Sequence, residues 1–577
     1  AKQGLVVAFC GAAPPPRAPA ERPPHRSLPM GFILSRPKFD PSLLVGAFKG
    51  ELQKKYDVVQ ALGVGRHGQV YRVRDKVSGV EYCAKKMHAQ DARSQADVKE
   101  EFEKMRTFMH PNCCKVVELV QSREIMDGVW KSSNYLICDL ARGSDLHGYI
   151  HGAATVGYDL HTEDWAAGVL KQLMQALAYM HGMDYVHNDV KPENVLVMTA
   201  FKPAEPFQVP WTVLADFGCA STIETAGTHF GDTRYQSPEK WRVLGPAFSG
   251  KEADEDLLAQ VDAKADVWAA GVSLFELLTG GVIPFIYQEV SLSDVLETPG
   301  GWKTIRRSVK EEELDVRSHY RDASNELVDI LQCMLSKNCE LRPSAVGALE
   351  HEWFDRAPLA KIAERRAKSL RMYPSKGIVH RILVNAFAAK VQREHYWDCW
   401  EAFQTFDTDR DGHISVDEFR ESKASLLRKT TMLPESKVSH MAQSNKDSID
   451  AAELKAFSSI DVDGNQKLNF TEFVAATFDW SSLEQSVMSH GLKALFDQMD
   501  SDGDGFIRQK DFFRLFQGSV PRQQLRTTFQ QMAGDDKLLS YKELKAYLFD
   551  PVEEGKPPSF RRRKSAPTTC CTAPCFC

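Results

Sequence analysis

The 577-residue chain carries 72 lysine and arginine residues against 78 aspartate and glutamate residues, a formal net charge of −6 at pH 7. This balance gives no general argument for a nucleic-acid partner, and 43% hydrophobic with 26% charged residues is the composition of a soluble globular protein. The length exceeds that of a single hydrophobic core, so we expect three or four units in a monomeric chain.

The cysteine pattern and the hydropathy bear on the expected cellular location of the chain and on the redox state of its thiols. Nine of the 13 cysteines are scattered singly or as one adjacent pair, without the paired C-x-x-C spacing of a zinc site, and the other four crowd the last eight residues. No apolar run reaches the ~18 residues that indicate a membrane span. These patterns predict a cytoplasmic protein with reduced thiols.

Residues 1–55 are predicted to form a disordered extension, and the first 29 of them contain no methionine and are rich in proline, alanine and arginine. The first methionine opens the run Met30-Gly31-Phe32-Ile33-Leu34-Ser35, which matches the M-G-x-x-x-[ST] signal for N-myristoylation. A start at Met30 would make Gly31 the acyl acceptor and would favour peripheral membrane association. The bulky Phe32 counts against this interpretation.

A glycine-rich loop of the form G-x-G-x-x-G-x-V follows Tyr56, where the pattern turns to β-strand. Its glycines let backbone amides close over phosphate groups, and Val70 would pack on an adenine. The next predicted strand, 82–87, carries the adjacent lysines Lys85 and Lys86. The candidate nucleotide-binding residues of the loop are Leu62, Gly63, Val64, Gly65, Arg66, His67, Gly68, Gln69 and Val70.

Two downstream segments connect this loop to a known family. Residues 187–197 read H-N-D-V-K-P-E-N-V-L-V, and residues 215–218 read A-D-F-G. Together with the loop and the lysine strand they resemble the protein kinase family, at that family's spacing, over residues 56–354. The resemblance implies an α+β bilobal fold that transfers the γ-phosphate of ATP with the help of Mg²⁺.

The resemblance also assigns the nucleotide contacts. Lys86 is the candidate for the α- and β-phosphates because an alanine, Ala84, stands two places before it, which leaves Lys85 as a solvated neighbour. Glu101, nine residues before the His-Pro-Asn that ends the next predicted helix, is the candidate ion-pair partner of that lysine. The nucleotide-binding set is completed by Ala84, by Asp139 at the expected interlobe hinge, and by Asp145.

Phosphoryl transfer needs a carboxylate to take the proton of the substrate hydroxyl, a cation for the transferring oxygens and a side-chain oxygen on Mg²⁺. Asp189, Lys191 and Asn194 fit these roles in that order, and Asp216 would hold Mg²⁺ against the β- and γ-phosphates. A lysine two places after the aspartate is the form found in serine/threonine kinases. The alternative is a pseudokinase, which keeps the fold but transfers no phosphate.

Three positions depart from the family pattern, among them Ser237, which stands for the alanine of the A-P-E region. Asn188 stands where most kinases have an arginine that binds a phosphate on the activation loop, so we expect control from elsewhere in the chain. Asp232 replaces a threonine that is common in the segment before the A-P-E region. Other positions follow the pattern: Asp266 is expected to brace the catalytic loop, and Arg342 is expected to pair with Glu239.

The last third of the chain repeats a twelve-residue acidic pattern. Calcium takes hard oxygen ligands at positions 1, 3, 5, 7, 9 and 12 of such a loop, with glycine at position 6. Three loops fit, at 407–418, 461–472 and 500–511. Their candidate Ca²⁺ ligands are Asp407, Asp409, Asp411, His413 and Glu418; Asp461, Asp463, Asn465, Lys467 and Glu472; and Asp500, Asp502, Asp504, Phe506 and Asp511.

These loops are not equivalent. The second has Gln466 at the glycine position, and the third ends in Asp511, whose shorter side chain predicts weaker calcium binding or a shift toward Mg²⁺. Because such hands pack in pairs, we expect a fourth loop at 532–543, with Leu539 and Glu543 at positions 8 and 12. Its first positions lack metal ligands, which predicts a pairing role without metal.

A kinase domain followed by four EF-hands resembles the calcium-dependent protein kinases of plants and protists. The resemblance implies a calmodulin-like domain over 399–548 and a junction at 355–398 that blocks the kinase until calcium moves it. In the junction, 359–369 is expected to be a basic helix and 378–391 an amphipathic one, although plain core packing explains the second equally well. Two other readings stay open: a calcium-responsive scaffold without catalysis, and a kinase that its EF-hands merely stabilise.

Residues 549–577 are predicted to be a basic, cysteine-rich, disordered tail. An arginine stands three residues before Ser565, the kind of site that kinases of this family often prefer. We therefore expect protein substrates with Arg at −3, for which Asp145 and Glu193 would supply acidic subsites. The basic run and the terminal cysteines offer another reading, anchoring at an anionic membrane by acylation or prenylation.

Overall fold

The computed structural model describes residues 46–49, 51–65, 68–87, 92–126, 129–247, 258–285, 301–356, 377–421, 454, 456–516, 520–534 and 537–549. They lie within one compact unit that spans 38–577. Several predicted features fall outside the described residues: the acylation site at Gly31, the loop residues Arg66 and His67, the basic helix at 359–369, and the tail beyond Phe549.

The N-terminal lobe is built on a sheet with strand order β1-β5-β6-β4-β3-β2, in which β1 runs parallel to β5 and the other neighbours are antiparallel. Successive side chains of a strand point to opposite faces. One face of β4 and β6 buries Ala84, Tyr135 and Ile137 in a small apolar cluster, whereas Leu136 and Cys138 join the main core on the other face. The elements are β1 (Gly46–Lys49), α1 (Leu52–Lys55), β2 (Tyr56–Gly65), β3 (Gly68–Asp75), β4 (Glu81–Met87), α2 (Ala92–Thr107), β5 (Val116–Met126) and β6 (Val129–Asp139).

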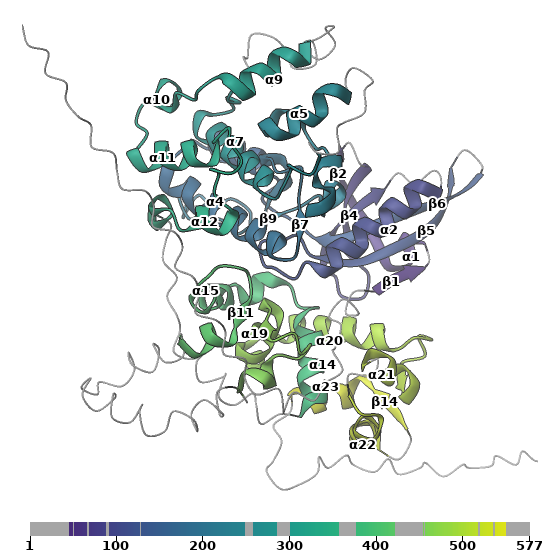
Figure 1. Ribbon diagram of the computed structural model, residues 1–577. Helices are drawn as coiled ribbons and strands as arrows, with labels where there is room; N and C mark the ends of the chain where they lie inside the picture. Colours follow the sequence, from purple (N-terminus) through teal and green to yellow (C-terminus); the bar gives the residue numbers. More distant parts are fainter. Residues whose placement is uncertain are drawn as a thin grey trace, which may run out of the picture. The chain divides into compact units, whose positions relative to one another are not determined.

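The C-terminal lobe is mainly helical, and its two long central helices, α4 and α7, pack against each other (Figure 1). Both are buried along most of their length, as expected for helices inside a large core. Gly280, in the left-handed conformation at φ 70°, ends α7. The helices are α3 (Leu146–Thr155), α4 (Glu163–Gly182), α5 (Pro238–Ala247), α7 (Lys264–Thr279), α9 (Gly301–Glu311), α10 (Val316–His319), α11 (Asn325–Met334) and α12 (Ala345–Leu349).

Short strands and 3₁₀ turns carry the segments with predicted catalytic residues. β7 pairs with β10 and β8 pairs with β9, so both ends of the loop at 187–194 are tied to ordered structure. These elements are β7 (Tyr185–Val186), η2 (Pro192–Asn194), β8 (Val195–Val197), β9 (Thr212–Leu214), η3 (Phe217–Cys219), β10 (Ser221–Thr222), η4 (Ile223–Thr228), η5 (Thr233–Tyr235) and η6 (Glu352–Arg356).

The C-terminal module has an apolar core of its own. Strand β11 pairs with β12 and β13 pairs with β14, so the four twelve-residue loops associate first with second and third with fourth. Leu539 lies opposite Ile507, as position 8 of the expected fourth loop requires. The elements are α14 (Ile378–Ala388), η8 (Arg393–Tyr396), α15 (Trp397–Phe406), β11 (Ile414–Ser415), β12 (Lys467–Leu468), α19 (Phe470–Thr477), η9 (Trp480–Ser482), α20 (Gln485–Met499), β13 (Phe506–Arg508), α21 (Gln509–Phe516), α22 (Arg522–Ala533), β14 (Leu538–Ser540) and α23 (Tyr541–Phe549).

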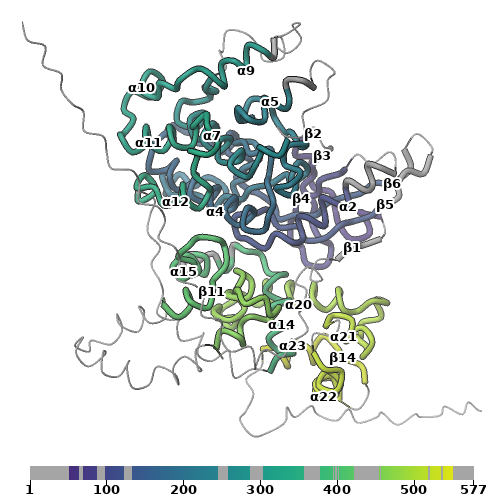
Figure 2. Tube along the Cα trace, in the orientation of Figure 1, coloured from purple at the N-terminus to yellow at the C-terminus, as the bar shows by residue number. Residues whose placement is uncertain are grey.

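Helix α14 is the amphipathic helix expected in the junction, and it is buried inside this module. It packs against α19, α20 and α23, of which α20 and α23 are labelled beside it in Figure 2. The ring of Phe387 meets the rings of Trp480 and Phe549 edge-on, with centroids 5.0 Å and 4.9 Å away. Its apolar stripe therefore serves as part of the module's core.

A bilobal α+β unit followed by a helical module confirms the predicted fold class. Of the helices in the described ranges, none is both long enough and apolar enough to cross a bilayer.

Candidate active site

Three predicted residues of the loop at 187–194 meet around one carboxylate. Oδ2 of Asp189 accepts hydrogen bonds from Nζ of Lys191 at 2.9 Å and from Nδ2 of Asn194 at 3.0 Å, and Oδ1 accepts one from the backbone N–H of Asp232 at 2.7 Å. The side chain of Asp189 is buried. A hydroxyl brought to this carboxylate would meet a proton acceptor with a fixed orientation.

The predicted brace of this loop is present. The carboxylate of Asp266 on α7 accepts hydrogen bonds from the backbone N–H groups of His187, at 2.7 Å, and Asn188, at 2.9 Å. Burial alone would raise the pKa of Asp266, yet its hydrogen bond with His181 lowers that pKa below the usual value, so the acceptor stays ionised. The predicted ion pair between Arg342 and Glu239 is also formed, at 2.7 Å and fully buried.

Lys85, and not Lys86, is the lysine of the site, which corrects the prediction. Nζ of Lys85 lies 3.0 Å from Oε1 of Glu101 and 2.8 Å from Oδ1 of Asp216. The ammonium of Lys86 lies instead 5.5 Å from the centre of the Tyr135 ring, among residues of the other face of the sheet. Glu101 and Asp216 are thus placed as predicted, but their partner is one residue earlier.

The alternation of side chains along β4 explains the error. Cys83 and Lys85 point to one face, and Ala84 and Lys86 point to the other, where Ala84 is buried in the small apolar cluster. Cys83 packs against the main core, so it holds the small-residue position two places before the lysine. Ala84 is therefore also wrong as a nucleotide contact. Two adjacent small residues followed by two lysines made the register ambiguous.

The turn that carries Asp216 has a defined conformation. Asp216 adopts a left-handed backbone, with φ 63° and ψ 73°. The next residue, Phe217, is fully buried, and its ring centre lies 5.1 Å from that of Phe108 and 5.4 Å from that of His187. This packing fixes the carboxylate of Asp216 toward Lys85, where an oxygen ligand for Mg²⁺ would have to lie.

The remaining candidates for nucleotide binding lie in the glycine-rich loop and at the start of α3. The glycine-rich loop joins β2 to β3, with Gly63 opposite Val70 and Gly65 opposite Gly68. The carboxylate of Asp145 accepts the backbone N–H of Gly148 at 2.8 Å and so caps α3.

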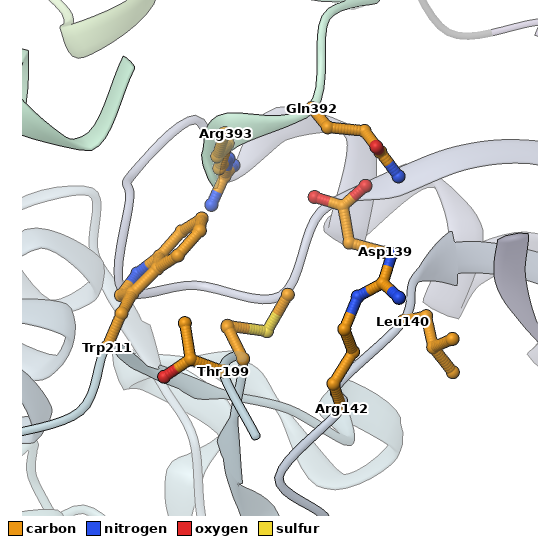
Figure 3. Close-up of a pocket in the computed structure, with 8 residues that line it drawn as sticks. Asp139, Leu140, Arg142, Thr199, Trp211, Gln392 and Arg393 are labelled. Carbon is orange, nitrogen blue, oxygen red and sulfur yellow. The ribbon is translucent and has the colours of Figure 1, made fainter. Parts of the chain in front are cut away.

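Asp139 follows Cys138, which lies opposite Cys83 on the face of the sheet that carries Lys85, so its side chain is directed to the other face. It lines a pocket together with Arg142, Trp211, Gln392 and Arg393, and its carboxylate faces the side chains of Gln392 and Arg393 (Figure 3). Only the main chain of Asp139 is therefore left for a nucleotide.

Arg234, for which the sequence analysis predicted no role, lies beside the expected acidic subsite at Glu193. The guanidinium of Arg234 donates to Oε1 of Glu193 at 2.9 Å and to Oδ2 of Asp232 at 2.8 Å. Glu193, expected as an acidic subsite, therefore already has an internal cationic partner. Asp232, which replaces a common threonine, holds that partner in place.

The first acidic loop gathers carboxylates as a cation site would. Oxygens of Asp407, Asp409 and Glu418 lie within 4.8 Å of one another. Burial, followed by the charges of Asp411, Glu418 and Asp409, raises the pKa of Asp407 to about 9. Oδ1 of Asp407 is buried and accepts no hydrogen bond. Clustered hard oxygens with an orphaned acceptor fit Ca²⁺.

The second loop has the same arrangement. Oxygens of Asp461, Asp463 and Glu472 lie within 4.8 Å of one another. Glu472 also accepts backbone N–H groups from within the loop, including that of Val462 at 2.8 Å. Gln466 adopts φ 66°, so the missing glycine costs strain but does not change the loop conformation. The side chain of Lys467 in the second loop reaches the first loop, where its Nζ lies 2.6 Å from Oδ2 of Asp411.

The third loop is more open. Asp500, Asp502 and Asp504 bring oxygens within 4.8 Å of one another, but Asp502 and Asp504 are exposed and both form ion pairs with Arg508. A bound cation would have to displace this guanidinium. The competition adds to the short reach of Asp511 as a reason for weaker calcium binding.

The loop after α2 also contacts the C-terminal module. Nη1 of Arg393 donates to the backbone carbonyls of His110, Pro111 and Cys113, at 3.0, 3.0 and 2.8 Å. The ring of Tyr179 on α4 stacks between His110 and His413, the latter at position 7 of the first acidic loop. Sequence patterns gave no signal for the Arg393 contacts, because they join residues about 280 positions apart.

Comparison with known domain families agrees with this geometry. The model of the protein kinase domain matches residues 56–354, which is more than half of the chain. The model of an EF-hand domain pair matches residues 398–478, and an EF-hand model matches residues 492–508.

Similar proteins align with most of the chain. The chain is 25% identical over 488 residues to calcium-dependent protein kinase 21 of Arabidopsis thaliana, covering 82% of this chain and 78% of that protein. It is 24% identical to calcium-dependent protein kinase 34 of the same plant, covering 92% and 89%. Calcium-dependent protein kinase 5 of Plasmodium falciparum is 23% identical, with 84% and 76% covered.

Proposed function

Because this chain belongs to the protein kinase family, we propose that it is a calcium-activated serine/threonine kinase that transfers the γ-phosphate of ATP to protein hydroxyl groups. One observation carries the catalytic part: Lys85 pairs with both Glu101 and Asp216, while Asp189 is held by Lys191 and Asn194. The acidic loops and the similarity to calcium-dependent protein kinases support the regulatory part.

The chain's own residues supply the groups for phosphoryl transfer. Burial favours the neutral amine of Lys85, but Glu101 and Asp216 raise its pKa above the usual value, so a cation faces the α- and β-phosphates. Asp216 and Asn194 would hold Mg²⁺, which neutralises charge on the phosphates. Asp189 would accept the proton of the substrate hydroxyl, and Lys191, which donates to it, would supply a cation for the transferring oxygens.

Calcium control is assigned to the C-terminal module. Without a cation, the clustered carboxylates of the first two loops repel one another, so calcium binding stabilises their closed arrangement. The junction is proposed to inhibit the kinase until that happens. Helix α14 belongs to the module's core, so the inhibitory part is assigned to the junction residues before it, of which 357–376 lie outside the described residues.

The experiment measures phosphate transfer from labelled ATP to a basic serine peptide, with calcium or with a chelator. We expect transfer only with calcium, and Asp189→Asn should lower kcat by about 10²–10⁴-fold because the proton acceptor is lost. Calcium-induced change in tryptophan fluorescence, unchanged in Asp189→Asn, controls for folding.

Two outcomes would contradict the proposal. No transfer from folded wild-type protein would favour a calcium-responsive scaffold without catalysis. Equal transfer with calcium and with chelator would mean that the EF-hands only stabilise the kinase.

A further inference from the structure

A buried lysine lies between the catalytic loop at 187–194 and the activation segment, the residues 219–230 that follow the Asp216 turn. Lys240, in the first turn of α5, has 1% of its surface exposed. Its Nζ donates to Oδ1 of Asn188 at 2.5 Å and to the backbone carbonyl of His229 at 3.2 Å. The ring of Phe230 lies 5.9 Å from the same ammonium. Lys240 therefore fixes the end of the activation segment to the catalytic loop.

Asn188 extends this contact to the start of the activation segment. Its Nδ2 donates to the carbonyl of Cys219 at 3.0 Å and to Oγ of Ser221 at 2.9 Å. The residue adopts φ 66°, a conformation that asparagine tolerates better than most residues. One amide thus joins both ends of the segment: its nitrogen holds 219–221, and its oxygen holds the lysine that binds His229.

The same contacts reach the catalytic carboxylate. Nε2 of Gln236 donates to the carbonyls of Asp232, at 3.1 Å, and of Asn188, at 3.5 Å. The N–H of Asp232 in turn donates to Oδ1 of Asp189. Displacing the segment would remove one of the hydrogen bonds that orient Asp189.

Burying the ammonium of Lys240 carries a free-energy penalty of desolvation. Burial lowers the pKa of Lys240 to about 8, against the attraction of Asp266, Cys219, Glu239 and Asp189. An apolar side chain of similar length would avoid this penalty. The cost is reasonable only if the two hydrogen bonds of the ammonium do something that packing alone would not.

We propose that Asn188 and Lys240 form an internal clamp that orders the activation segment in place of an arginine–phosphate contact, and that both act as positioning residues for Asp189. The proposal rests on the proposed kinase function and names its on-state: the segment is ordered without being phosphorylated. The clamp takes no part in the chemistry and touches no substrate.

The test compares Lys240→Met, Asn188→Ala and the double variant in full-length protein with calcium. Lys337→Met is the matched control, because that ammonium lies 3.2 Å from the ring centre of Phe285 and makes no contact with the catalytic loop in the described structure. Measured are kcat and KM for ATP, amide hydrogen exchange in 219–230, and thermal stability.

We expect either single variant to lower kcat roughly 10–100-fold with an unchanged KM for ATP, because Asp189 loses its orientation while Lys85 and Glu101 are untouched. Exchange in 219–230 should increase. In Lys240→Met the loss of a buried charge raises stability, while Oδ1 of Asn188 and the carbonyl of His229 lose a donor, so the two effects on the melting temperature oppose each other. The kcat of the double variant should be no lower than that of the less active single variant, because both substitutions break the same contact between Asn188 and Lys240. Lys337→Met should leave kcat and exchange unchanged.

An unchanged kcat, or a fall in kcat without faster exchange in 219–230, would overturn the clamp. If Lys240→Met does not fold, Asn188→Ala carries the same test. If wild type transfers no phosphate, the proposed function fails, but exchange in 219–230 still decides whether the clamp orders the segment.

Discussion

Lys85 and Lys86 are adjacent in the sequence, but their ammonium groups have different contacts on opposite faces of the sheet. Lys85 contacts two carboxylates that face the expected phosphates, and Lys86 lies over the ring of Tyr135 on the opposite face of the sheet. Any loss of activity should therefore depend on which of these adjacent lysines is replaced.

Lys85→Met should lower kcat on the order of 10²-fold, because a preorganised cation facing the phosphates is lost. Lys86→Met, the matched control, should keep its activity and lose at most the about 0.5–1 kcal/mol of stability typical of an exposed cation–π contact. Steady-state kinetics and thermal melts of both variants check this. The opposite ranking of the two variants would contradict the assignment.

At this scale the sequence predicted residues whose roles are set by local spacing. Asp189, Lys191 and Asn194 fall within six positions, and the short loop forces them together. Lys85 was misassigned because strand register depends on which face is buried, and both Cys83 and Ala84 are small enough for either face. Lys240 and Arg234 carried no signal, since their partners are set by how the activation segment folds back on the loop.

The segment with η5 bears directly on substrate choice. Arg234 shares its guanidinium between Asp232 and Glu193, and its side chain and that of Glu193 are 33% and 36% exposed. A substrate arginine directed to Glu193 must compete with this internal cation. The proposed preference for Arg at −3 should consequently be weaker than free carboxylates at Asp145 and Glu193 would give.

Arg234→Ala should release Glu193 and raise the selectivity for Arg over Ala at −3 by about twofold to fivefold, the effect of a partly exposed ion pair. Arg234→Lys keeps the charge and should change selectivity less. The ratio of kcat/KM values for two peptides that differ only at −3 measures the effect. An unchanged ratio in Arg234→Ala would mean that Glu193 does not contact that side chain.

Among whole elements, those with strong local patterns were predicted best. The acidic loops and the strand that pairs each hand with its neighbour follow from fixed ligand spacing. The sequence could not decide between a core position and an inhibitory role for helix α14. An apolar stripe has the same pattern in a helix buried in a core and in a helix that binds another surface. Only its packing against α19, α20 and α23 decides between the two.

On the scale of the whole molecule, stacked rings connect the first acidic loop to the end of the helix that carries Glu101. His413 in that loop stacks on Tyr179, Tyr179 stacks on His110, and His110 follows α2. Gly412 lies so close to Tyr179 that a Cβ there would come within 2.7 Å of the ring. A cation that changes the position of His413 would therefore act on the end of α2 through the stacked rings of Tyr179 and His110.

Arg393 adds a polar contact to this connection, because one buried guanidinium donates to three backbone carbonyls after α2. In Arg393→Leu the carbonyl of Cys113 would lose this donor, at about 1–3 kcal/mol if it stays buried. The carbonyls of His110 and Pro111 keep the N–H of Cys113 and Nε1 of Trp211, so the module should hold the loop less tightly. We expect calcium-stimulated kcat to fall toward the chelator value while Lys85 and Glu101 remain intact. Arg522→Leu, an exposed arginine of α22 in the same module, is the control and should behave as wild type.

The decisive measurement is calcium affinity, because coupling between two binding equilibria is reciprocal. If calcium strengthens docking of the module, loss of docking must weaken calcium binding by the same factor, within the roughly 5–150-fold range of such couplings. Calorimetric titration of Arg393→Leu should therefore show weaker binding at the first loop pair, and Arg522→Leu should not. A variant that loses stimulation yet binds calcium like wild type would show that Arg393 supports the kinase without transmitting the calcium signal.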